Sequence, residues 1–478
     1  MSVNNVVTKA HKAFAESQDH SYAERAGWLE EIAAQLEAHR ESLVAVAKQE
    51  THLPEARLNA ELMRTSFQLR FLAAEVRRGE FLDPTIDRED AEWRMGRRPD
   101  IRSFCVPRGV TGVFGASNFP FAFSVAGGDS AAALAAGCSV VHKVHQGHTS
   151  LGETTLEVVI DALSASGAPD GIFSTVTGRE AGISLVEHPL VKAVAFTGST
   201  VGGRALFDRA AARPEPIPFY GELDSINPVV VTEMAWHKRS GDIARGFIES
   251  MTAGNGQFCT KPGLLFVPSS LADEVFSIIS DGLAITELSA KMLNDRIWEG
   301  FVEARNAVGS CSEILAATPS NDANPPKPSV FRAHAGDLEN HSALLTTEMF
   351  GPAAVIVSYS DQTELISTLS DLHGQLTGTF HAEEGEAVGP LVRVLTERCG
   401  RVIKNEWPTG VTVSYAQNHG GPYPAATADV TSVGSAAIGR FLRPVAYQNF
   451  SDAELPAALQ DGNPLGLSQR RVNGHWHQ

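Results

Sequence analysis

The sequence predicts an α/β protein with two parallel-sheet domains and a small β element, and three observations support this. From Gly109 onwards, short apolar strands alternate with helices, an order that is typical of parallel sheets. A second series of such units follows from about Asp242 to Gly400, after a proline-rich segment. Between Trp93 and Val113 the residues instead alternate like exposed strands around a turn, which indicates an edge hairpin.

The composition is that of an ordinary globular protein. A chain of 478 residues is long enough for two or three domains. Its formal net charge of -17 argues against nucleic acid and against an anionic membrane surface as partners. The first twenty or so residues lack the apolar core of a signal peptide, and the most apolar stretch, 119–141, contains Asp129. We therefore expect a cytoplasmic protein that does not bind membranes.

One of the five cysteines differs from the rest. Cys259 follows Gly254-Asn255-Gly256-Gln257-Phe258, a setting that suits a tight turn with an accessible thiol. This pattern alone leaves two alternatives, a catalytic thiol or a turn cysteine without chemistry. The wide spacing predicts neither disulfides nor a metal site, and three neighbouring histidines do not change that expectation. The cysteines interpreted as residues without chemistry are Cys105, Cys138, Cys311 and Cys399.

Residues 4–78 are predicted to form helices, because apolar residues recur there at helical spacing. Pro54 interrupts them. In the last of these helices Arg64 and Gln68 lie one turn apart and therefore share a face. A solvated face and a functional face are both open interpretations of this pair.

Two strand ends in the first α/β series indicate a dinucleotide site. One strand ends in Lys143, followed closely by Gln146, and another ends in the turn Thr197-Gly198-Ser199-Thr200-Val201-Gly202-Gly203. A glycine- and hydroxyl-rich turn at a helix start presents free N–H groups to a phosphate. The alternative is that these residues only form turns between strands and helices, and the common G-x-G-x-x-G fingerprint is absent. Together on one sheet the two motifs favour the dinucleotide site.

Several motifs then coincide in order along nearly the whole chain. They are NFPF from Asn118, VHK ending at Lys143, FTGST around Thr197, YGELDSINP around Glu222, GQFCT around Cys259, EMFGP from Glu348 and NEWPTGV from Asn405. With them the chain resembles the aldehyde dehydrogenase superfamily. The branch it resembles most comprises 2-oxoglutarate-semialdehyde (2,5-dioxopentanoate) dehydrogenases and NADP-dependent fatty aldehyde dehydrogenases. The segments that suggest this branch are ETHLPEARLNAE, RTSFQLR, ARPEPIPFYGE and the tail from HGGPYPA to FLRPVAYQN.

The resemblance implies a Rossmann-like fold of three parts. A coenzyme-binding domain would comprise 1–92 and 111–221, and a catalytic domain would comprise 222–424. A hairpin at 93–110 and a C-terminal arm at 425–478 would form an oligomerisation element. Homodimers or homotetramers are usual in the family.

The resemblance also implies roles in oxidising an aldehyde to an acid. Cys259 would be the nucleophile that forms a thiohemiacetal and then a thioester, and Asn118 with the Cys259 N–H would stabilise the oxyanion. Glu222 would be the general base for hydrolysis, and its apolar sequence context suggests a raised pKa. Glu348 and Phe350 match residues that hold the nicotinamide ribose. Relatives that transfer the acyl group to coenzyme A usually lack the base.

Two departures from the family pattern matter. Many relatives have glycine where this chain has Asp224, and an extra carboxylate there would alter the base or the local turn. NAD-preferring relatives often have glutamate where this chain has Gln146. A neutral residue does not repel a 2′-phosphate, so NADP is expected, with NAD as the alternative.

For the substrate, the resemblance places the helix with Arg64 and Gln68 beside the tunnel, where an arginine would bind the distal carboxylate of an oxo acid. Phe119 and Phe258 would line the tunnel. The expected partner is thus a small aldehyde, most simply 2-oxoglutarate semialdehyde. The alternatives are a medium or long aliphatic aldehyde and, in a different class, a non-catalytic coenzyme-binding homologue.

Overall fold

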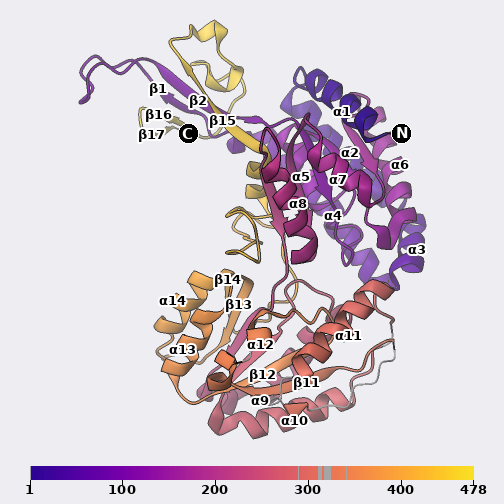
Figure 1. Cartoon of the computed structure of the whole chain (residues 1–478). Coiled ribbons are helices and arrows are strands. Elements are labelled where there is room, and N and C mark those ends of the chain that lie inside the picture. Colours follow the sequence, from indigo (N-terminus) through magenta and orange to yellow (C-terminus); the bar gives the residue numbers. More distant parts are fainter. Residues whose placement is uncertain (1, 289, 311–314, 317–323, 341, 478) are drawn as a thin grey trace.

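The computed structural model of the chain describes residues 2–288, 290–310, 315–316, 324–340 and 342–477. Its strands form three sheets. Figure 1 shows two bodies in which helices pack on a sheet, with the third sheet projecting from the upper body. The α/β fold class predicted from the alternation of strands and helices is confirmed.

Four helices at the start of the chain cover part of the upper body (Figure 1). Their apolar residues recur at helical spacing, and Leu29, Ile32 and Leu62 lie fully buried in one core. Pro54 directly precedes the fourth helix, where its missing N–H costs no helical hydrogen bond. The helices are α1 (Val3–Ser17), α2 (Tyr22–Ala38), α3 (Arg40–Thr51) and α4 (Glu55–Arg78).

The first parallel sheet has the strand order β5-β4-β3-β6-β7. The chain moves outward from β3 to β5 and then returns to β6, so the strand order reverses between β3 and β6. Ligands of such sheets bind outside the carboxyl ends of the strands at this reversal. The strands are β3 (Val110–Phe114), β4 (Ser139–Lys143), β5 (Phe173–Val176), β6 (Val191–Thr197) and β7 (Phe219–Glu222), with helices α5 (Gly128–Ala136), α6 (Thr149–Ala165), α7 (Arg179–Glu187) and α8 (Thr200–Ala212).

The second sheet has the order β10-β11-β12-β9-β8-β13-β14 and is parallel except for β10. All seven residues of β12 are buried, as expected for a strand covered by helices on both faces. The strands are β8 (Pro228–Val231), β9 (Leu264–Pro268), β10 (Leu315–Ala316), β11 (Ser329–His334), β12 (Ala353–Tyr359), β13 (Gln375–His381) and β14 (Cys399–Lys404). The helices are α9 (Glu233–Thr252), α10 (Ala272–Ala284), α11 (Asp295–Gly309), α12 (Ser342–Thr346), α13 (Gln362–Asp371) and α14 (Gly389–Arg398).

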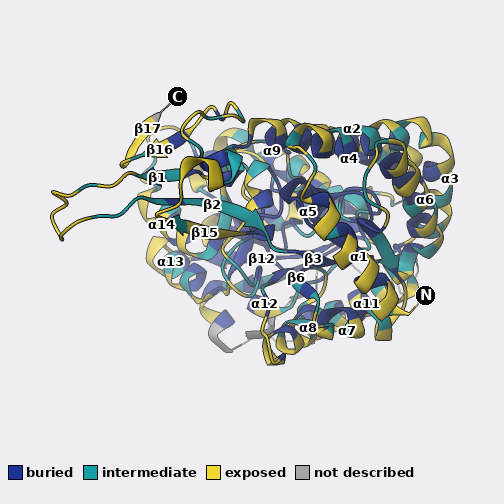
Figure 2. Cartoon of the chain, turned by 90° about the horizontal axis from the view of Figure 1, so that it is seen from above, coloured by how far each residue is buried: buried dark blue, intermediate teal, exposed yellow. Residues whose placement is uncertain are grey.

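The third sheet joins segments from both halves of the chain in the order β15-β2-β1-β16-β17. Its strands are β1 (Thr85–Asp87), β2 (Ile101–Pro107), β15 (Leu442–Gln448), β16 (Arg470–Val472) and β17 (His475–His477). Residues 88–100 connect β1 to β2 as an exposed arm that extends from the body (Figure 2). The hairpin therefore begins at Thr85, earlier than the alternating pattern from Trp93 predicts. The pattern missed β1 because a strand of three residues is too short to show alternation.

Among the helices of the described residues, none combines the length and the apolar character that a membrane span requires.

Candidate active site

The turn before Cys259 depends on unusual backbone conformations. Gly254, Asn255 and Gly256 have positive φ angles of 55°, 58° and 69°. A side chain at Gly256 would lie 2.2 Å from the carbonyl group of Gly351, so only glycine fits there. The glycine- and amide-rich sequence before the thiol thus forms the tight turn that its composition predicts.

Asn227 holds the backbone at Cys259. Its Nδ2 donates to the carbonyl oxygens of Cys259 and Lys261, at 2.8 and 3.0 Å. Asn227 is itself fully buried, with its N–H donating to Gln375 Oε1 and its Oδ1 accepting from the Thr377 N–H, at 3.0 and 3.1 Å. Leaving buried amides unpaired is costly, so this network fixes the thiol against the second sheet.

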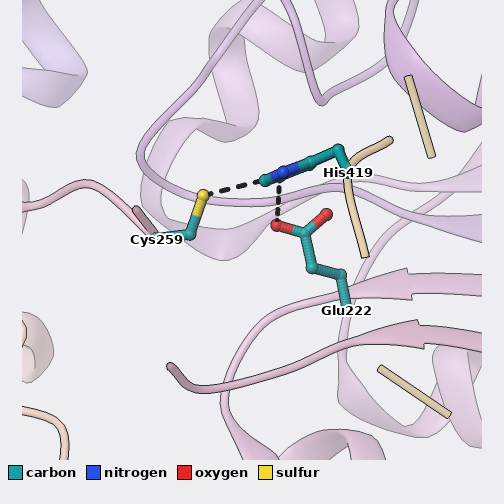
Figure 3. A group of neighbouring side chains, drawn as sticks. All are labelled: Glu222, Cys259 and His419. Atoms are coloured by element: carbon teal, nitrogen blue, oxygen red, sulfur yellow. Dashed lines mark hydrogen bonds and ion pairs between the residues drawn. The ribbon is translucent and has the colours of Figure 1, made fainter. Parts of the chain in front are cut away.

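The thiol of Cys259, the imidazole of His419 and the carboxylate of Glu222 form one cluster (Figure 3). Nε2 of His419 lies 3.7 Å from Cys259 Sγ and 2.8 Å from Glu222 Oε1. His419 and Glu222 are buried, whereas Cys259 is half-buried. A ring nitrogen that contacts both a thiol and a carboxylate is placed to move a proton between them.

Two distant segments bring this cluster together. Glu222 ends β7 and pairs in register with Thr197, the last residue of β6, so it projects from the carboxyl edge of the first sheet. The backbone N–H of His419 donates to Thr431 Oγ1 at 2.8 Å. Oγ of Ser432 lies 3.2 Å both from Glu222 Oε2 and from the His419 carbonyl oxygen. The segment from 419 to 432 therefore closes over Glu222.

The pKa values of the acid and the thiol move in opposite directions. Burial raises the pKa of Glu222, but the charge and hydrogen bond of His419, with hydrogen bonds from Cys259 and Ser432, outweigh it and lower the pKa below its ordinary value. The raised pKa expected from the apolar sequence context is therefore wrong, because polar partners from distant segments surround the carboxylate. Burial and the Glu222 charge raise the pKa of the Cys259 thiol well above its ordinary value. At neutral pH the free enzyme thus holds a carboxylate beside a protonated thiol.

Asn118 follows β3 and lies beside the Cys259 turn. Its buried Nδ2 donates to the Gln257 carbonyl oxygen at 2.9 Å. The Arg57 guanidinium donates to the carbonyl oxygen of Asn118 at 3.2 Å and so fixes its backbone. The bond to Gln257 uses one of the two N–H donors of the amide.

Arg64 and Gln68 share a face of α4, as their spacing predicts, with 3.5 Å between Arg64 Nη1 and Gln68 Oε1. Nη2 of Arg64 donates to the Val411 carbonyl oxygen at 3.2 Å. Burial lowers the pKa of Arg64, and the charges of Glu61 and Cys259 oppose that shift. The guanidinium thus lies within electrostatic reach of the thiol.

Phe119 and Phe258 meet edge to face, with 5.2 Å between ring centres. The Arg57 guanidinium lies 4.6 Å from both ring centres and 3.5 Å from the Glu61 carboxylate. The sequence pattern did not single out Arg57, a second cation beside the turn that precedes Cys259. Its position two helical turns before Arg64, and so on the same face of α4, was the available signal.

The first turn of α8 lies at the carboxyl edge of the first sheet. Oγ of Ser199 accepts from the Gly202 N–H at 3.4 Å, and both Gly198 and Ser199 are exposed. Close packing requires a glycine at position 203, where a side chain would lie 2.2 Å from Leu223. Gly202 has more room, because a side chain would lie 3.4 Å from its nearest neighbour, Ser199 Oγ. The turn therefore packs tightly against the residue after β7, while Gly198 and Ser199 stay exposed.

Lys143 ends β4, half-buried, and the exposed Gln146 lies just beyond it. Burial and then the charge of Arg296 lower the pKa of Lys143. The start of α11 lies against this loop, because a side chain on Gly147 would be 3.0 Å from Asn294 Nδ2. Lys143, at the end of β4, and Arg296, in the first turn of α11, therefore bring two positive charges to the same loop.

Glu348 and Phe350 lie half-buried between α12 and β12. Glu348 lines a small pocket with Ser225 and Lys261. Burial, followed by the charge of Asp224, raises the pKa of Glu348 well above its ordinary value, although Lys261 opposes this. Burial lowers the pKa of Lys261 to about 8, which Glu348 opposes in turn.

Cys138 and Cys399 are buried and Cys105 is half-buried, and all three are free thiols away from the cluster. Cys311 lies outside the described residues. His419 is the main residue that the sequence analysis missed. It is 160 positions from Cys259, and its only sequence signal was that it opens the HGGPYPA segment quoted for the branch.

Known proteins share both the sequence and the fold of this chain. The model of the aldehyde dehydrogenase family matches residues 1–298. The chain is 41% identical over 487 residues to the alpha-ketoglutaric semialdehyde dehydrogenase of Acinetobacter baylyi, covering 99% of this chain and 91% of that protein. It is also 41% identical over 486 residues to alpha-ketoglutaric semialdehyde dehydrogenase 2 of Azospirillum brasilense, covering 97% and 89%. A solved lactaldehyde dehydrogenase has the same fold, with a TM-score of 0.79 at 19% identity over 94% of this chain and 91% of that one.

Proposed function

Because this chain belongs to the aldehyde dehydrogenase family, we propose that it oxidises 2-oxoglutarate semialdehyde (2,5-dioxopentanoate) to 2-oxoglutarate with NAD(P) as the oxidant. The family and the enzyme class that the ordered motifs indicated are confirmed. The substrate is supported by the names of two relatives that match over nearly the whole chain, since alpha-ketoglutarate is 2-oxoglutarate. The observation that carries the proposal is the cluster of Cys259, His419 and Glu222.

In the first step the thiol proton leaves Sγ of Cys259. Nε2 of His419 accepts it, and the resulting imidazolium stays paired with the Glu222 carboxylate. The thiolate then attacks the aldehyde carbon. The oxyanion that forms is stabilised by the second N–H of the Asn118 amide and by the backbone N–H of Cys259. The bound coenzyme would accept the hydride from that carbon, and a thioester on Cys259 remains.

The second step hydrolyses the thioester. After the reduced coenzyme leaves, the carboxylate of Glu222 takes a proton from water, and the hydroxide attacks the thioester carbonyl. The carboxylic acid is released and Cys259 leaves as a thiolate, which regains its proton from His419, while Glu222 releases to solvent the proton that it took from water. The lowered pKa of Glu222 keeps it in the basic form at neutral pH. Its presence favours a free acid as product over transfer to coenzyme A.

The coenzyme would be held by residues at the carboxyl edge of the first sheet. Thr197, Gly198, Ser199 and Gly202 form the turn that faces its diphosphate, and Lys143 and Gln146 face the adenosine ribose. This edge fits a phosphorylated group, because Gly198 and Ser199 at the start of α8 are exposed and Arg296 brings a second cation near Lys143. Two cations beside a neutral Gln146 favour NADP, with its 2′-phosphate, over NAD. Glu348 and Phe350 would hold the nicotinamide ribose.

The distal carboxylate of the substrate would bind Arg64, with Gln68 beside it. The Arg64 guanidinium is close enough for the Cys259 thiol to affect its pKa. The aldehyde and the carboxylate of this semialdehyde are only a few atoms apart, so one molecule could reach both residues. Phe119 and Phe258 form an apolar wall of the same tunnel. This wall favours a medium or long aliphatic aldehyde as the second candidate substrate.

The third sheet is proposed to be the oligomerisation element of a homodimer or homotetramer. It consists of the hairpin with its exposed arm and of the C-terminal strands, and it projects from the rest of the molecule (Figure 2). The proposed domains are 1–92 with 111–221 for the coenzyme, 222–424 for catalysis, and 93–110 with 425–478 for assembly, except that β1 (Thr85–Asp87) belongs to the third sheet and therefore to assembly.

The test measures coenzyme reduction with NADP or NAD across 2,5-dioxopentanoate, succinic semialdehyde and a neutral aliphatic aldehyde. We expect the highest kcat/KM for 2,5-dioxopentanoate with NADP. Preference for the neutral aldehyde would assign the protein to the second candidate substrate. Coenzyme binding without turnover of any aldehyde would indicate a non-catalytic homologue.

A further inference from the structure

The side chains of Cys259, His419 and Glu222 form a group whose chemistry goes beyond proton transfer (Figure 3). One sulfur, one ring nitrogen and one carboxylate oxygen all lie within 4.8 Å of one another. Among the residues that the structure describes, this is the one place where three such side chains come together. Thiolate, imidazole and carboxylate are the ligands that zinc takes in proteins. The proposed catalytic cluster is therefore also a set of zinc ligands.

The distances between these atoms suit a tetrahedral zinc ion. Zinc binds its ligands at about 2.0 to 2.3 Å, which places nitrogen about 3.5 Å from sulfur and about 3.3 Å from oxygen. Nε2 of His419 lies 3.7 Å from Cys259 Sγ and 2.8 Å from Glu222 Oε1. The first distance already matches the ion. The second requires the carboxylate to move by about half an ångström, which rotation of the Glu222 side chain supplies.

The surroundings of the group also favour an ion. His419 and Glu222 are only 2% and 3% exposed, so their polar atoms face each other rather than solvent. Cys259 is half-buried and leaves an approach to the group from outside. A divalent ion bound by one thiolate and one carboxylate adds no net charge to this buried place. Three protein ligands leave the fourth position of the ion to a water molecule.

Asp224 follows Glu222 by two residues but does not belong to this group. Its Oδ2 accepts a hydrogen bond from the Thr200 N–H at 3.1 Å, and its own N–H donates to Thr200 Oγ1 at 3.4 Å. Of the two effects expected from the sequence, on the base or on the local turn, these contacts indicate the second. Glu222 therefore supplies the carboxylate of the group.

We propose that Cys259, His419 and Glu222 form a zinc-binding site in the free enzyme, and that zinc bound there reversibly inhibits aldehyde oxidation. The site rests on the geometry of the three side chains, whereas the inhibition rests on the proposed function. When zinc binds, a Zn–S bond forms and the thiol releases its proton to solvent. Sγ is then not free to attack an aldehyde, and Glu222 is not free to take a proton from water. Both steps of the proposed reaction stop until a chelator removes the ion.

The first experiment measures metal binding by the tag-free chain without aldehyde or coenzyme. Co²⁺ is the probe, because it occupies the same N/O/S sites as zinc and its bond to a thiolate absorbs strongly in the near ultraviolet. We expect one Co²⁺ per chain with this band, and displacement by Zn²⁺ gives the Kd for zinc. Cys259→Ser should lose the band. His419→Gln should raise the Kd about 100-fold or more, since even losing a group that only orients a ligand costs roughly 10- to 100-fold.

Two variants outside the group are the matched controls. Cys105→Ser removes another half-buried free thiol, on β2, and His373→Gln removes an exposed imidazole before β13. Both should keep the wild-type band and Kd. A measurement on the wild type alone covers the case in which a variant fails to fold. Zn²⁺ should protect Cys259 from alkylation by iodoacetamide, and the protected fraction should follow the zinc occupancy.

The second experiment measures inhibition. Coenzyme reduction with 2,5-dioxopentanoate should fall to half its rate at a free Zn²⁺ concentration near the Kd from cobalt displacement. Excess EDTA should restore the full rate.

The site and its effect on catalysis fail in different ways. If the wild type shows no thiolate band and no protection of Cys259, or if Cys259→Ser keeps the band, the zinc site is overturned while the enzyme assignment stands. If zinc binds with the band and the active enzyme keeps its rate, the inhibition is overturned. If the zinc-free wild type binds Co²⁺ with the band but oxidises no aldehyde, the proposed function fails and the metal site stands.

Discussion

Nε2 of His419 lies 2.8 Å from Oε1 of Glu222, and both side chains are buried. The two residues come from opposite ends of a long stretch of chain, β7 and the tail that follows β14. The same nitrogen is the atom that contacts the Cys259 thiol. The nucleophile Cys259 and the base Glu222 of the proposed reaction therefore share His419 as a partner. Replacing any one of these three side chains alters the surroundings of the other two.

Replacing His419 by glutamine tests the shared partner. We expect kcat to fall by about 100-fold, since a positioned proton-transfer group contributes at least this much. Steady-state coenzyme reduction is the measurement. His373→Gln, an exposed histidine in the loop before β13, is the control and should keep the wild-type rate. An active His419→Gln enzyme would mean that the thiol loses its proton without the imidazole.

Glu222→Gln separates the two steps. Because the amide cannot take a proton from water, thioester hydrolysis should slow by about 100-fold or more. The first turnover needs no water, so rapid mixing should show a stoichiometric burst of reduced coenzyme followed by a slow steady rate. Mass spectrometry should find the acyl group on Cys259. Absence of both the burst and the adduct would show that the first step itself needs Glu222.

The pKa of the thiol gives a prediction without any substrate. Since burial and the Glu222 charge raise the pKa of Cys259, the thiolate fraction is small at neutral pH and grows as the pH rises toward that pKa. Alkylation of Cys259 by iodoacetamide, located by mass spectrometry, should therefore accelerate with pH. Glu222→Gln removes the charge, lowers the pKa and should speed alkylation at neutral pH. Glu249→Gln, an exposed glutamate on α9, should not.

Asn118 supplies the oxyanion donor in the proposed mechanism. Asn118→Ala should lower kcat by about 100-fold or more, the usual cost of such a donor, with a smaller change in KM. Asn118→Asp should be similarly impaired, because a carboxylate has the size of the amide but donates nothing. If the aspartate variant kept its activity, donation by this side chain would play no part in the reaction.

Arg64→Gln tests recognition of the distal carboxylate. We expect KM for 2,5-dioxopentanoate to rise by about tenfold or more, the loss typical of a charge-assisted hydrogen bond, and KM for a neutral aldehyde to stay unchanged. Arg70→Gln on the same helix removes an exposed arginine that pairs with Glu37 and should affect neither substrate. Equal effects of Arg64→Gln on both aldehydes would remove this arginine from the account of specificity.

The order of strands and helices could be predicted because it depends on short-range patterns. The strand from Val110 to Phe114 and the helix from Gly128 to Ala136 begin the alternation expected from Gly109 onwards, since an apolar run and an alanine-rich run each favour one structure locally. β1, β16 and β17 have three residues each, and runs this short carry no periodicity. They become strands by pairing with neighbouring strands of the third sheet, β2 among them.

Only those site residues could be predicted that lie in a motif formed by their own neighbours in the sequence. Cys259 lies in a turn that its own neighbours define, whereas His419 reaches the thiol through the fold of a distant tail. The direction of the Asp224 side chain was likewise invisible, because it depends on how β7 lies against the start of α8. The pKa of Glu222 was predicted in the wrong direction for the same reason, since its polar partners come from other segments.

The third sheet also constrains the timing of synthesis. β1 pairs with β16, and the N–H of Arg88 donates to a side chain 385 positions later, on Asn473. At cellular rates of translation the hairpin of β1 and β2 waits about 20 seconds or more for these neighbours to leave the ribosome. During that interval the free strand edges of the hairpin are open to pairing with other nascent chains. The third sheet is therefore complete only once β16 and β17 have been synthesised.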